Sequence, residues 1–149
     1  MNNQEEILSN LSDLFGKMLL LNKPMLEADL PDVKLTEVET IEIIANTELT
    51  NVTKISEALH ITRGAASKIT KKLQSKGYIE SYQKPENKKE IYFRLTARGQ
   101  EIEAAHQKHH QNVMKRDEKI FDQMSETDGQ IILDFVKCYK EHLDQELKK

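Results

Sequence analysis

A group of basic residues in the middle of the chain could bind a polyanion. Between Thr62 and Lys76 there are five Lys and Arg residues and no Asp or Glu, although the 149-residue chain has a net charge of −3. Residues 1–50, 51–98 and 99–149 have net charges of −7, +7 and −3. A basic block between acidic flanks predicts a nucleic-acid surface. A solvated lysine-rich face without a ligand is the alternative.

The same segment has the pattern of a helix with one apolar and one cationic side. At about 100° per residue, Ala66, Ile69 and Leu73 share one face, and the opposite face is small, polar and basic. Such a helix can enter a major groove, where its N-terminal part meets the bases. The predicted DNA-contacting residues are Arg63, Gly64, Ser67, Lys68, Thr70, Lys71 and Lys72. The last three are assigned to phosphates, and the small Gly64 permits close approach.

The elements that position this helix are a preceding short helix and a following hairpin. Residues Asn51 to Leu59 are predicted to form the short helix. Gly77 is suited to end the basic helix. Residues 78–83 and 90–95 are rich in β-branched and aromatic side chains and flank a polar turn, which predicts a β-hairpin. This hairpin is called the wing, and its predicted DNA contacts are Lys84, Lys88 and Lys89.

Helices are predicted on both sides of this region. Ile7–Leu21 repeats apolar residues at helical spacing, and Pro24 and Pro31 then bracket an irregular link. Thr36 and Glu39 resemble a capping box. A long helix is expected from Thr96 to Met124, and a last one after a cap at Ser125. The predicted fold is mainly α with a small β-hairpin wing, divided into residues 1–34, 35–96 and 97–149 within one continuous domain.

The first and last predicted helices carry more apolar surface than a small winged domain can cover. A homodimer would bury these faces, although packing within one subunit is the alternative. The predicted interface residues are Ile7, Leu11, Leu14, Met18, Phe135, Tyr139 and Leu143. A two-fold dimer would present two basic helices to successive major grooves, so the expected target is an inverted repeat.

The stretches ISEALHITRGAASKITKKLQSKGYIE and PENKKEIYFRLTARGQEI resemble the MarR family of winged helix-turn-helix transcription regulators. The family's Leu-Thr-x-x-Gly motif is intact at Leu95–Gly99. The resemblance implies a homodimeric regulator, usually a repressor, whose terminal helices interlock and whose DNA affinity responds to a small-molecule effector. Asn87 and Lys89 stand where the family commonly has a wing Asp and Arg. Because Lys lacks the planar fork of Arg, we expect the wing to supply mainly salt-sensitive affinity.

Two histidines suggest a metal-binding alternative. His106 and His110 are four residues apart on one predicted helix, a suitable spacing for two zinc ligands. His109 is adjacent, and Cys138 or His142 could complete such a site. Some MarR-like regulators sense zinc through histidines in this region, but they also use acidic and histidine ligands near the start of the second helix, where this chain has no histidine. The same spacing and LTEVETIEII also resemble the branch that represses fatty-acid synthesis genes and responds to acyl chains on a carrier protein.

Other functional classes find little support in the sequence. There is no glycine-rich phosphate loop, nucleophile motif or paired-carboxylate motif, so neither an enzyme nor a cofactor is predicted. One cysteine excludes an internal disulfide framework. The mean hydropathy of −0.65 and the acidic N-terminus predict a cytoplasmic protein without a membrane span. A helical protein-interaction module that does not bind DNA remains the rival hypothesis.

Overall fold

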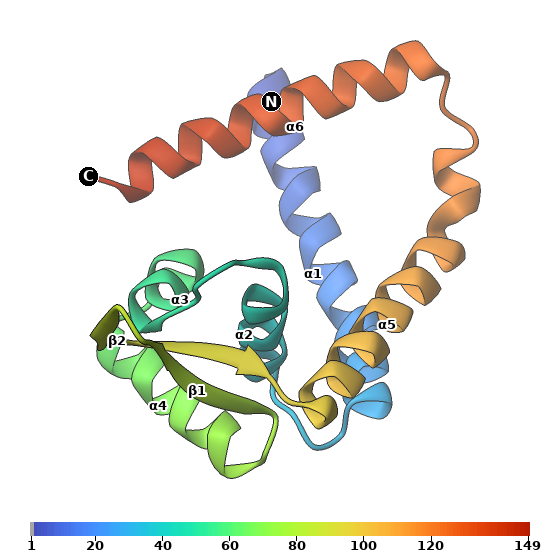
Figure 1. Ribbon diagram of the computed structural model, residues 1–149. Helices are drawn as coiled ribbons and strands as arrows, with labels where there is room; N and C mark the ends of the chain where they lie inside the picture. The colour runs from blue at the N-terminus through green and yellow to red at the C-terminus, as the bar shows by residue number, and fades with distance from the viewer. Residues whose placement is uncertain (1) are drawn as a thin grey trace. The chain divides into compact units, whose positions relative to one another are not determined.

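The computed structural model describes residues 2–149 and is mainly helical with a two-stranded hairpin (Figure 1), which confirms the predicted fold class. Its elements, in chain order, are α1 (Asn3–Asp29), α2 (Leu35–Asn46), α3 (Val52–Leu59), α4 (Arg63–Ser75), β1 (Ile79–Lys84), β2 (Asn87–Leu95), α5 (Ala97–Phe121) and α6 (Glu126–Leu147). The chain divides into two compact units, one up to Gln111 and one from Asn112. The functional division predicted at residues 34 and 96 falls just before α2 and α5 and stays a prediction.

One hydrophobic core holds the helix-turn-helix and the hairpin together. Ile41, Ile55 and Leu73, from three different helices, are fully buried. They pack with Ile79 and Phe93 from the two strands. The apolar side predicted for the basic helix is therefore the buried side of α4. Because α4 is fixed along this face, its opposite side is presented to solvent.

Capping residues set the ends of α4. The Thr62 side chain accepts a hydrogen bond from the Ala65 N–H at 3.0 Å and begins the helix, as expected. Beyond the other end, Gly77 has a φ of 80°, a conformation that glycine adopts at little cost. The Thr96 hydroxyl donates to the Gly77 carbonyl at 2.6 Å. The end of α4 is thus tied to the start of α5.

The hairpin pairs Ile79 with Leu95 and Tyr82 with Tyr92, with an irregularity between Tyr82 and Lys84. On the other edge of β2, the Phe93 N–H donates to the Thr50 carbonyl at 2.9 Å. The segment between α2 and α3 therefore adds a third, short partner to the hairpin. This hydrogen bond fixes the wing against the helix-turn-helix.

The first helix is longer than predicted. α1 continues through Pro24 as far as Asp29, so the irregular link begins later than expected. Proline has no N–H and leaves the carbonyl four residues earlier without its helical partner. That residue, Leu20, is 76% exposed, so water can hydrate the carbonyl. The exposure of this part of α1 is consistent with the helix tolerating the proline.

The predicted capping box of α2 is also wrong, because the observed one lies two residues earlier. The helix begins at Leu35, so Thr36 lies inside it, and the capping hydrogen bond joins the Lys34 N–H to Glu37 Oε1 at 2.9 Å. Glu37 is buried. A basic residue distant in sequence also holds its carboxylate, as described below, and the sequence pattern could not show this.

The unit from Asn112 contains the end of α5 and all of α6. The Ser125 side chain caps α6 by accepting from the Asp128 N–H at 3.1 Å, as predicted. Within α6, the rings of Phe135 and Tyr139 pack edge to face with their centroids 5.9 Å apart. None of the α6 residues is buried. Within residues 2–149, no helix is both long enough and apolar enough to cross a lipid bilayer.

Candidate nucleic-acid interface

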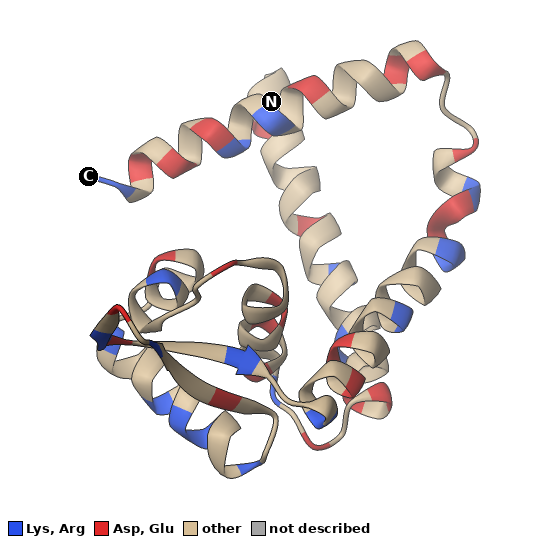
Figure 2. Cartoon of the chain, viewed as in Figure 1, with Lys and Arg blue, Asp and Glu red and all other residues tan. Residues whose placement is uncertain are grey.

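The solvent-facing side of α4 carries most of the predicted recognition residues. Arg63, Gly64, Lys68, Lys71 and Lys72 are exposed. Figure 2 shows basic positions along α4 and no acidic one. Within residues 2–149, none of these four cationic side chains forms a salt bridge. Their charges are available to an external anion.

Two predicted residues of α4 are less accessible. Ser67 is half-buried. Thr70 is 2% exposed, and its hydroxyl donates to the Ser67 carbonyl at 2.9 Å. This burial removes the Thr70 side chain from the predicted phosphate contacts. Because Thr70 is four residues after Ala66 and three before Leu73, it belongs to the buried stripe, which is wider than the sequence pattern predicted.

Gly64 has no structural reason to lack a side chain. A Cβ placed there would meet only the Thr62 hydroxyl oxygen, at 3.9 Å. Its φ is not positive, unlike that of Gly77. Folding of this chain therefore does not require glycine at position 64. A requirement for close approach by another molecule would explain it.

The last basic residue of this segment is engaged within the protein. The ammonium group of Lys76 lies 2.9 Å from Glu37 Oε1 and donates to the Asp32 carbonyl, also at 2.9 Å. Burial alone would raise the pKa of Glu37. The hydrogen bonds from the Lys34 N–H and from Lys76 outweigh burial and lower this pKa below its ordinary value. The pair fixes the C-terminal end of α4 against the start of α2.

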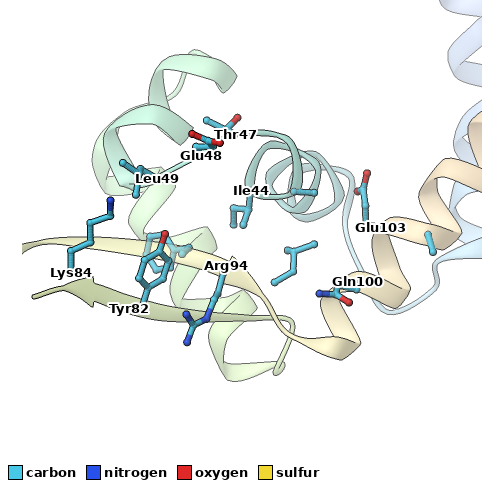
Figure 3. A pocket seen from close by; sticks show the side chains of 13 residues that line it. Ile44, Thr47, Glu48, Leu49, Tyr82, Lys84, Arg94, Gln100 and Glu103 are labelled. Carbon is cyan, nitrogen blue, oxygen red and sulfur yellow. The ribbon is translucent and has the colours of Figure 1, made fainter.

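The wing lysines occupy two different places. Lys88 and Lys89 are exposed near the hairpin turn. There the Asn87 side chain accepts from the Lys89 N–H at 3.2 Å, and Gln83 donates to the Lys88 carbonyl at 2.6 Å. Lys84 is half-buried instead and lines a hollow beside the hairpin (Figure 3). The sequence could not separate these roles, because all three lysines surround the same turn.

The histidines form a cluster with an acidic residue that the sequence pattern did not indicate. One ligand atom each from Glu42, His106 and His110 lie within 4.8 Å of one another. Burial and the neighbouring His110 lower the pKa of His106, although Glu42 and Glu103 oppose this shift. Two imidazoles and a carboxylate are suitable zinc ligands, one short of a closed tetrahedral set. The second helix, which has no histidine, contributes a glutamate to the cluster.

The other candidate ligands have different surroundings. His109 Nδ1 is 3.4 Å from Asp29 Oδ2 at the end of α1. Cys138 is exposed on α6. His142 also belongs to α6, in the second unit.

Comparison with known proteins identifies the family. The MarR family pattern matches residues 33–91, which include α2, α3, α4 and part of the hairpin. YhjH, an HTH-type transcriptional regulator of Bacillus subtilis, is 35% identical over 92 residues. The matched region is 62% of this chain and 53% of YhjH, so it spans about half the length of that relative. Residues 33–91 of this chain belong to the MarR family. The family predicted from the two quoted stretches is thereby confirmed.

Other MarR-family likenesses extend over nearly the whole chain. The HTH-type transcriptional regulator PchR of Bacillus subtilis is 27% identical over 148 residues, or 90% of this chain and 88% of PchR. The crystal structure of Streptococcus pneumoniae FabT in complex with DNA has a TM-score of 0.84 at 24% identity, over 96% of this chain and 99% of that one. Lactococcus lactis ZitR in complex with DNA has a TM-score of 0.68 at 21% identity, with 96% and 99% covered. The MarR winged-helix fold therefore includes the flanking helices as well as residues 33–91.

Proposed function

We propose that this MarR-family transcriptional regulator is a cytoplasmic homodimeric repressor that binds an inverted repeat in double-stranded DNA. Each subunit inserts α4 into a major groove and places Lys88 and Lys89, beside the hairpin turn, on the adjacent backbone. A small-molecule effector changes the affinity by altering the spacing or charge of these two elements. The role is regulatory, and no residue is assigned to catalysis.

The observation that carries the proposal is the exposed cationic side of α4, which contains no acid. Arg63 and Lys68 lie toward its N-terminal half, where a recognition helix meets base edges. Lys71 and Lys72 follow one turn later, at positions suited to phosphates. A carboxylate on this side would face DNA phosphate and weaken binding. The structures of FabT and ZitR with DNA support the same use of this fold.

Apolar surface on α1 and α6 supports the dimer. None of the α1 or α6 side chains is buried within the single chain. The large apolar side chains that are at least 40% exposed on these two helices are Ile7, Leu8, Leu14, Phe15, Met18, Leu19, Leu20, Leu21, Ile131, Ile132, Leu133, Phe135, Val136, Leu143 and Leu147. Of the remaining predicted interface residues, Leu11 and Tyr139 are half-buried. Exposed apolar faces of this kind on individual helices are typical of protein–protein interfaces.

Fluorescence anisotropy with labelled duplexes tests DNA binding directly. The labelled site is first selected from genomic fragments by the protein itself, and a random duplex of equal length is the reference. Arg63→Ala should reduce discrimination between the two duplexes by about 1–3 kcal/mol if Arg63 contacts a base. Lys71→Ala should weaken binding to both duplexes and lower the salt slope by about 0.9 for each phosphate that the protein no longer neutralises.

Lys108→Ala is the matched control, because Lys108 is exposed on α5 and lies outside the proposed interface. It removes the same charge and should leave the salt slope nearly unchanged. If wild-type protein bound neither duplex at low salt, a protein-interaction module would be the better interpretation. If Lys108→Ala and Lys71→Ala had equal effects, binding would depend on net charge and not on α4.

Response to zinc is a second candidate function, favoured by the Glu42–His106–His110 cluster. One fold relative, Lactococcus lactis ZitR, is described as a zinc-responsive MarR family member and has a TM-score of 0.64 at 21% identity. Competition for zinc against a chromogenic chelator measures the affinity without DNA. His110→Ala should weaken zinc binding by at least tenfold if the cluster holds the metal. Equal zinc affinities of wild type and His110→Ala would exclude this site.

A further inference from the structure

The wing is attached to the helix-turn-helix by two hydrogen bonds at different levels. Near the base of the hairpin, the Phe93 N–H donates to the Thr50 carbonyl at 2.9 Å. Three residues closer to the turn, the Asn51 side-chain amide donates to Glu90 Oε1 at 2.7 Å, on the side of the hairpin near α3 (Figure 1). Within residues 2–149, no hydrogen bond between the hairpin and the rest of the chain lies nearer to the turn. The direction of the tip therefore depends on the Asn51–Glu90 bond, here called the wing tether.

Asn51 uses both ends of its side-chain amide. Its Oδ1 accepts from the Lys54 N–H at 2.9 Å and caps α3. The amide nitrogen therefore faces Glu90, and an ionised acceptor makes such a bond stronger than one between neutral groups. Asn51 and Glu90 are both half-buried, which limits competition from water. One residue thus begins the first helix of the helix-turn-helix and holds the strand that carries the wing lysines.

An acidic residue at position 90 is unfavourable for DNA binding by itself. Glu90 directly follows Lys88 and Lys89, the two exposed lysines of the proposed backbone contact. A carboxylate beside them repels phosphate and partly cancels their charge. The hydrogen bond to Asn51 gives this carboxylate a role that offsets the repulsion.

The wing tether reaches the recognition helix through α3. Ile55 of α3 and Leu73 of α4 are fully buried in one core. A shift of α3 relative to α4 would open that core. A wing held on α3 therefore keeps its place relative to α4, whereas a free wing must be ordered during DNA binding, at a cost in conformational entropy.

We propose that Asn51 and Glu90 are positioning residues for DNA binding. The wing tether holds Lys88 and Lys89 where they meet the backbone of the duplex that α4 has entered. Neither Asn51 nor Glu90 has to touch DNA. They act on the contribution of the wing lysines, and the lysines of α4 keep their own. The effect on DNA binding rests on the proposed function, whereas the effect of the tether on the free wing does not.

Three variants separate the tether from total charge and from helix capping. Asn51→Asp keeps the cap of α3, because Asp caps helices as well as Asn does, but it places a carboxylate against Glu90 and breaks the tether. Glu90→Gln keeps an acceptor oxygen for Asn51. In Asn51→Asp/Glu90→Gln, the glutamine amide can donate to the aspartate, which restores the tether with its polarity reversed. This double variant has the net charge of wild type, so any difference between the two proteins has another origin.

Hydrogen exchange followed by mass spectrometry tests the tether without DNA. Loss of one hydrogen bond to a charged group should speed exchange of the backbone amides in residues 86–92 roughly tenfold in Asn51→Asp. Glu90→Gln and the double variant should exchange as slowly as wild type, and exchange in α6 should not change. If Asn51→Asp exchanged at the wild-type rate over residues 86–92, the tether would not hold the wing and the proposal would be wrong.

Fluorescence anisotropy with the selected DNA site then measures what the tether does for binding. Lys88→Ala/Lys89→Ala should weaken the affinity of wild type roughly tenfold, because two phosphate contacts are lost. In the Asn51→Asp background, the same two substitutions should weaken binding only about twofold, because the displaced wing contributes little. In the Asn51→Asp/Glu90→Gln background, the loss should again be roughly tenfold.

Lys71→Ala/Lys72→Ala is the matched control, because it removes two charges from α4. Its effect should be the same in all three backgrounds. If Asn51→Asp reduced the effects of both lysine pairs alike, the disruption would be general. If it left the effect of the wing pair unchanged, or if the wing pair had no effect in wild type, the tether would not position a DNA contact. Each of these results refutes the proposal.

The proposed function can fail separately from the tether. Absence of any DNA binding by wild type at low salt would refute the proposed function. The exchange experiment would still decide whether the tether holds the wing, because it contains no DNA.

Discussion

Replacement of Glu37 by glutamine tests whether the Glu37–Lys76 pair holds α4 in place. Glutamine keeps the size of the side chain and an oxygen that can accept from the Lys34 N–H, but it removes the negative charge. The Glu37 side chain is only 3% exposed, and that of Lys76 is 28% exposed. The variant therefore leaves a partly buried ammonium group without its opposite charge, although the Asp32 carbonyl still accepts from it.

The expected decrease in stability follows from this geometry. Removal of one partner from a fully buried ion pair costs about 3–5 kcal/mol. Lys76 can be partly hydrated, so we expect Glu37→Gln to lower the free energy of unfolding by about 2 kcal/mol at pH 7. Urea unfolding at matched protein concentration measures this difference. With an m-value of about 2 kcal/mol per molar, the midpoint should fall by about 1 M.

The difference should also depend on pH in a defined direction. The pKa of Glu37 is lowered in the folded protein from its ordinary value of 4.5. A carboxyl group with a lowered pKa in the folded protein stabilises the fold at pH values above its pKa in the unfolded chain. This stabilisation is lost as the pH falls through its pKa in the folded protein. The gap between wild type and Glu37→Gln should therefore be constant near neutral pH and shrink below pH 4.5.

Glu80→Gln is the control, because it breaks the exposed pair with Arg94, in which the Arg94 and Glu80 side chains are 59% and 52% exposed. It should cost at most about 1 kcal/mol. Equal stability of Glu37→Gln and wild type at pH 7 would refute the stabilising role of the pair. A gap that persisted unchanged at pH 3 would show that charge is not its origin.

Three further predictions concern packing, assembly and the wing. Gly99→Ala should destabilise the protein by at least about 3 kcal/mol in thermal unfolding, because a Cβ would overlap the Tyr78 carbonyl and neither backbone can move freely; an unchanged midpoint would refute this packing. Leu14→Asp should yield monomers in sedimentation experiments and lose operator affinity, and a stable dimer with normal binding would contradict the α1 interface. Lys89→Ala should lower the salt slope of operator binding by about 0.9 per subunit; an unchanged slope would mean that Lys89 does not contact phosphate.

The fold could be predicted largely because its signals are local. Thr62, Gly77 and Ser125 mark helix ends through their own side chains or backbone freedom, and the structure uses all three as expected. The switch from helical spacing to alternating β-branched residues after Gly77 located the hairpin. Pro24 was misjudged because proline usually ends a helix, and its tolerance depends on exposure of the neighbouring carbonyl, which sequence does not show.

The site was predicted less completely, because several of its interactions join distant parts of the chain. Lys76 pairs with Glu37, 39 positions away in the sequence. One positive charge of the basic segment is therefore balanced within the protein, which the local sequence does not indicate. Glu42 joins His106 only once α2 and α5 are in contact. Thr70 lies on the boundary between the two sides of α4, where a polar residue can satisfy its hydroxyl internally and remain buried. The dimer and DNA contacts stay predictions.

The bond from Lys76 to the Asp32 carbonyl has a mechanical consequence. It connects the short link that follows α1 directly to the C-terminal end of α4. We expect a rotation of α1 to reach the recognition helix partly through this hydrogen bond, outside the hydrophobic core. The Lys76 ammonium group links the segment after α1 to the end of α4, and we expect its removal to let these two segments move independently.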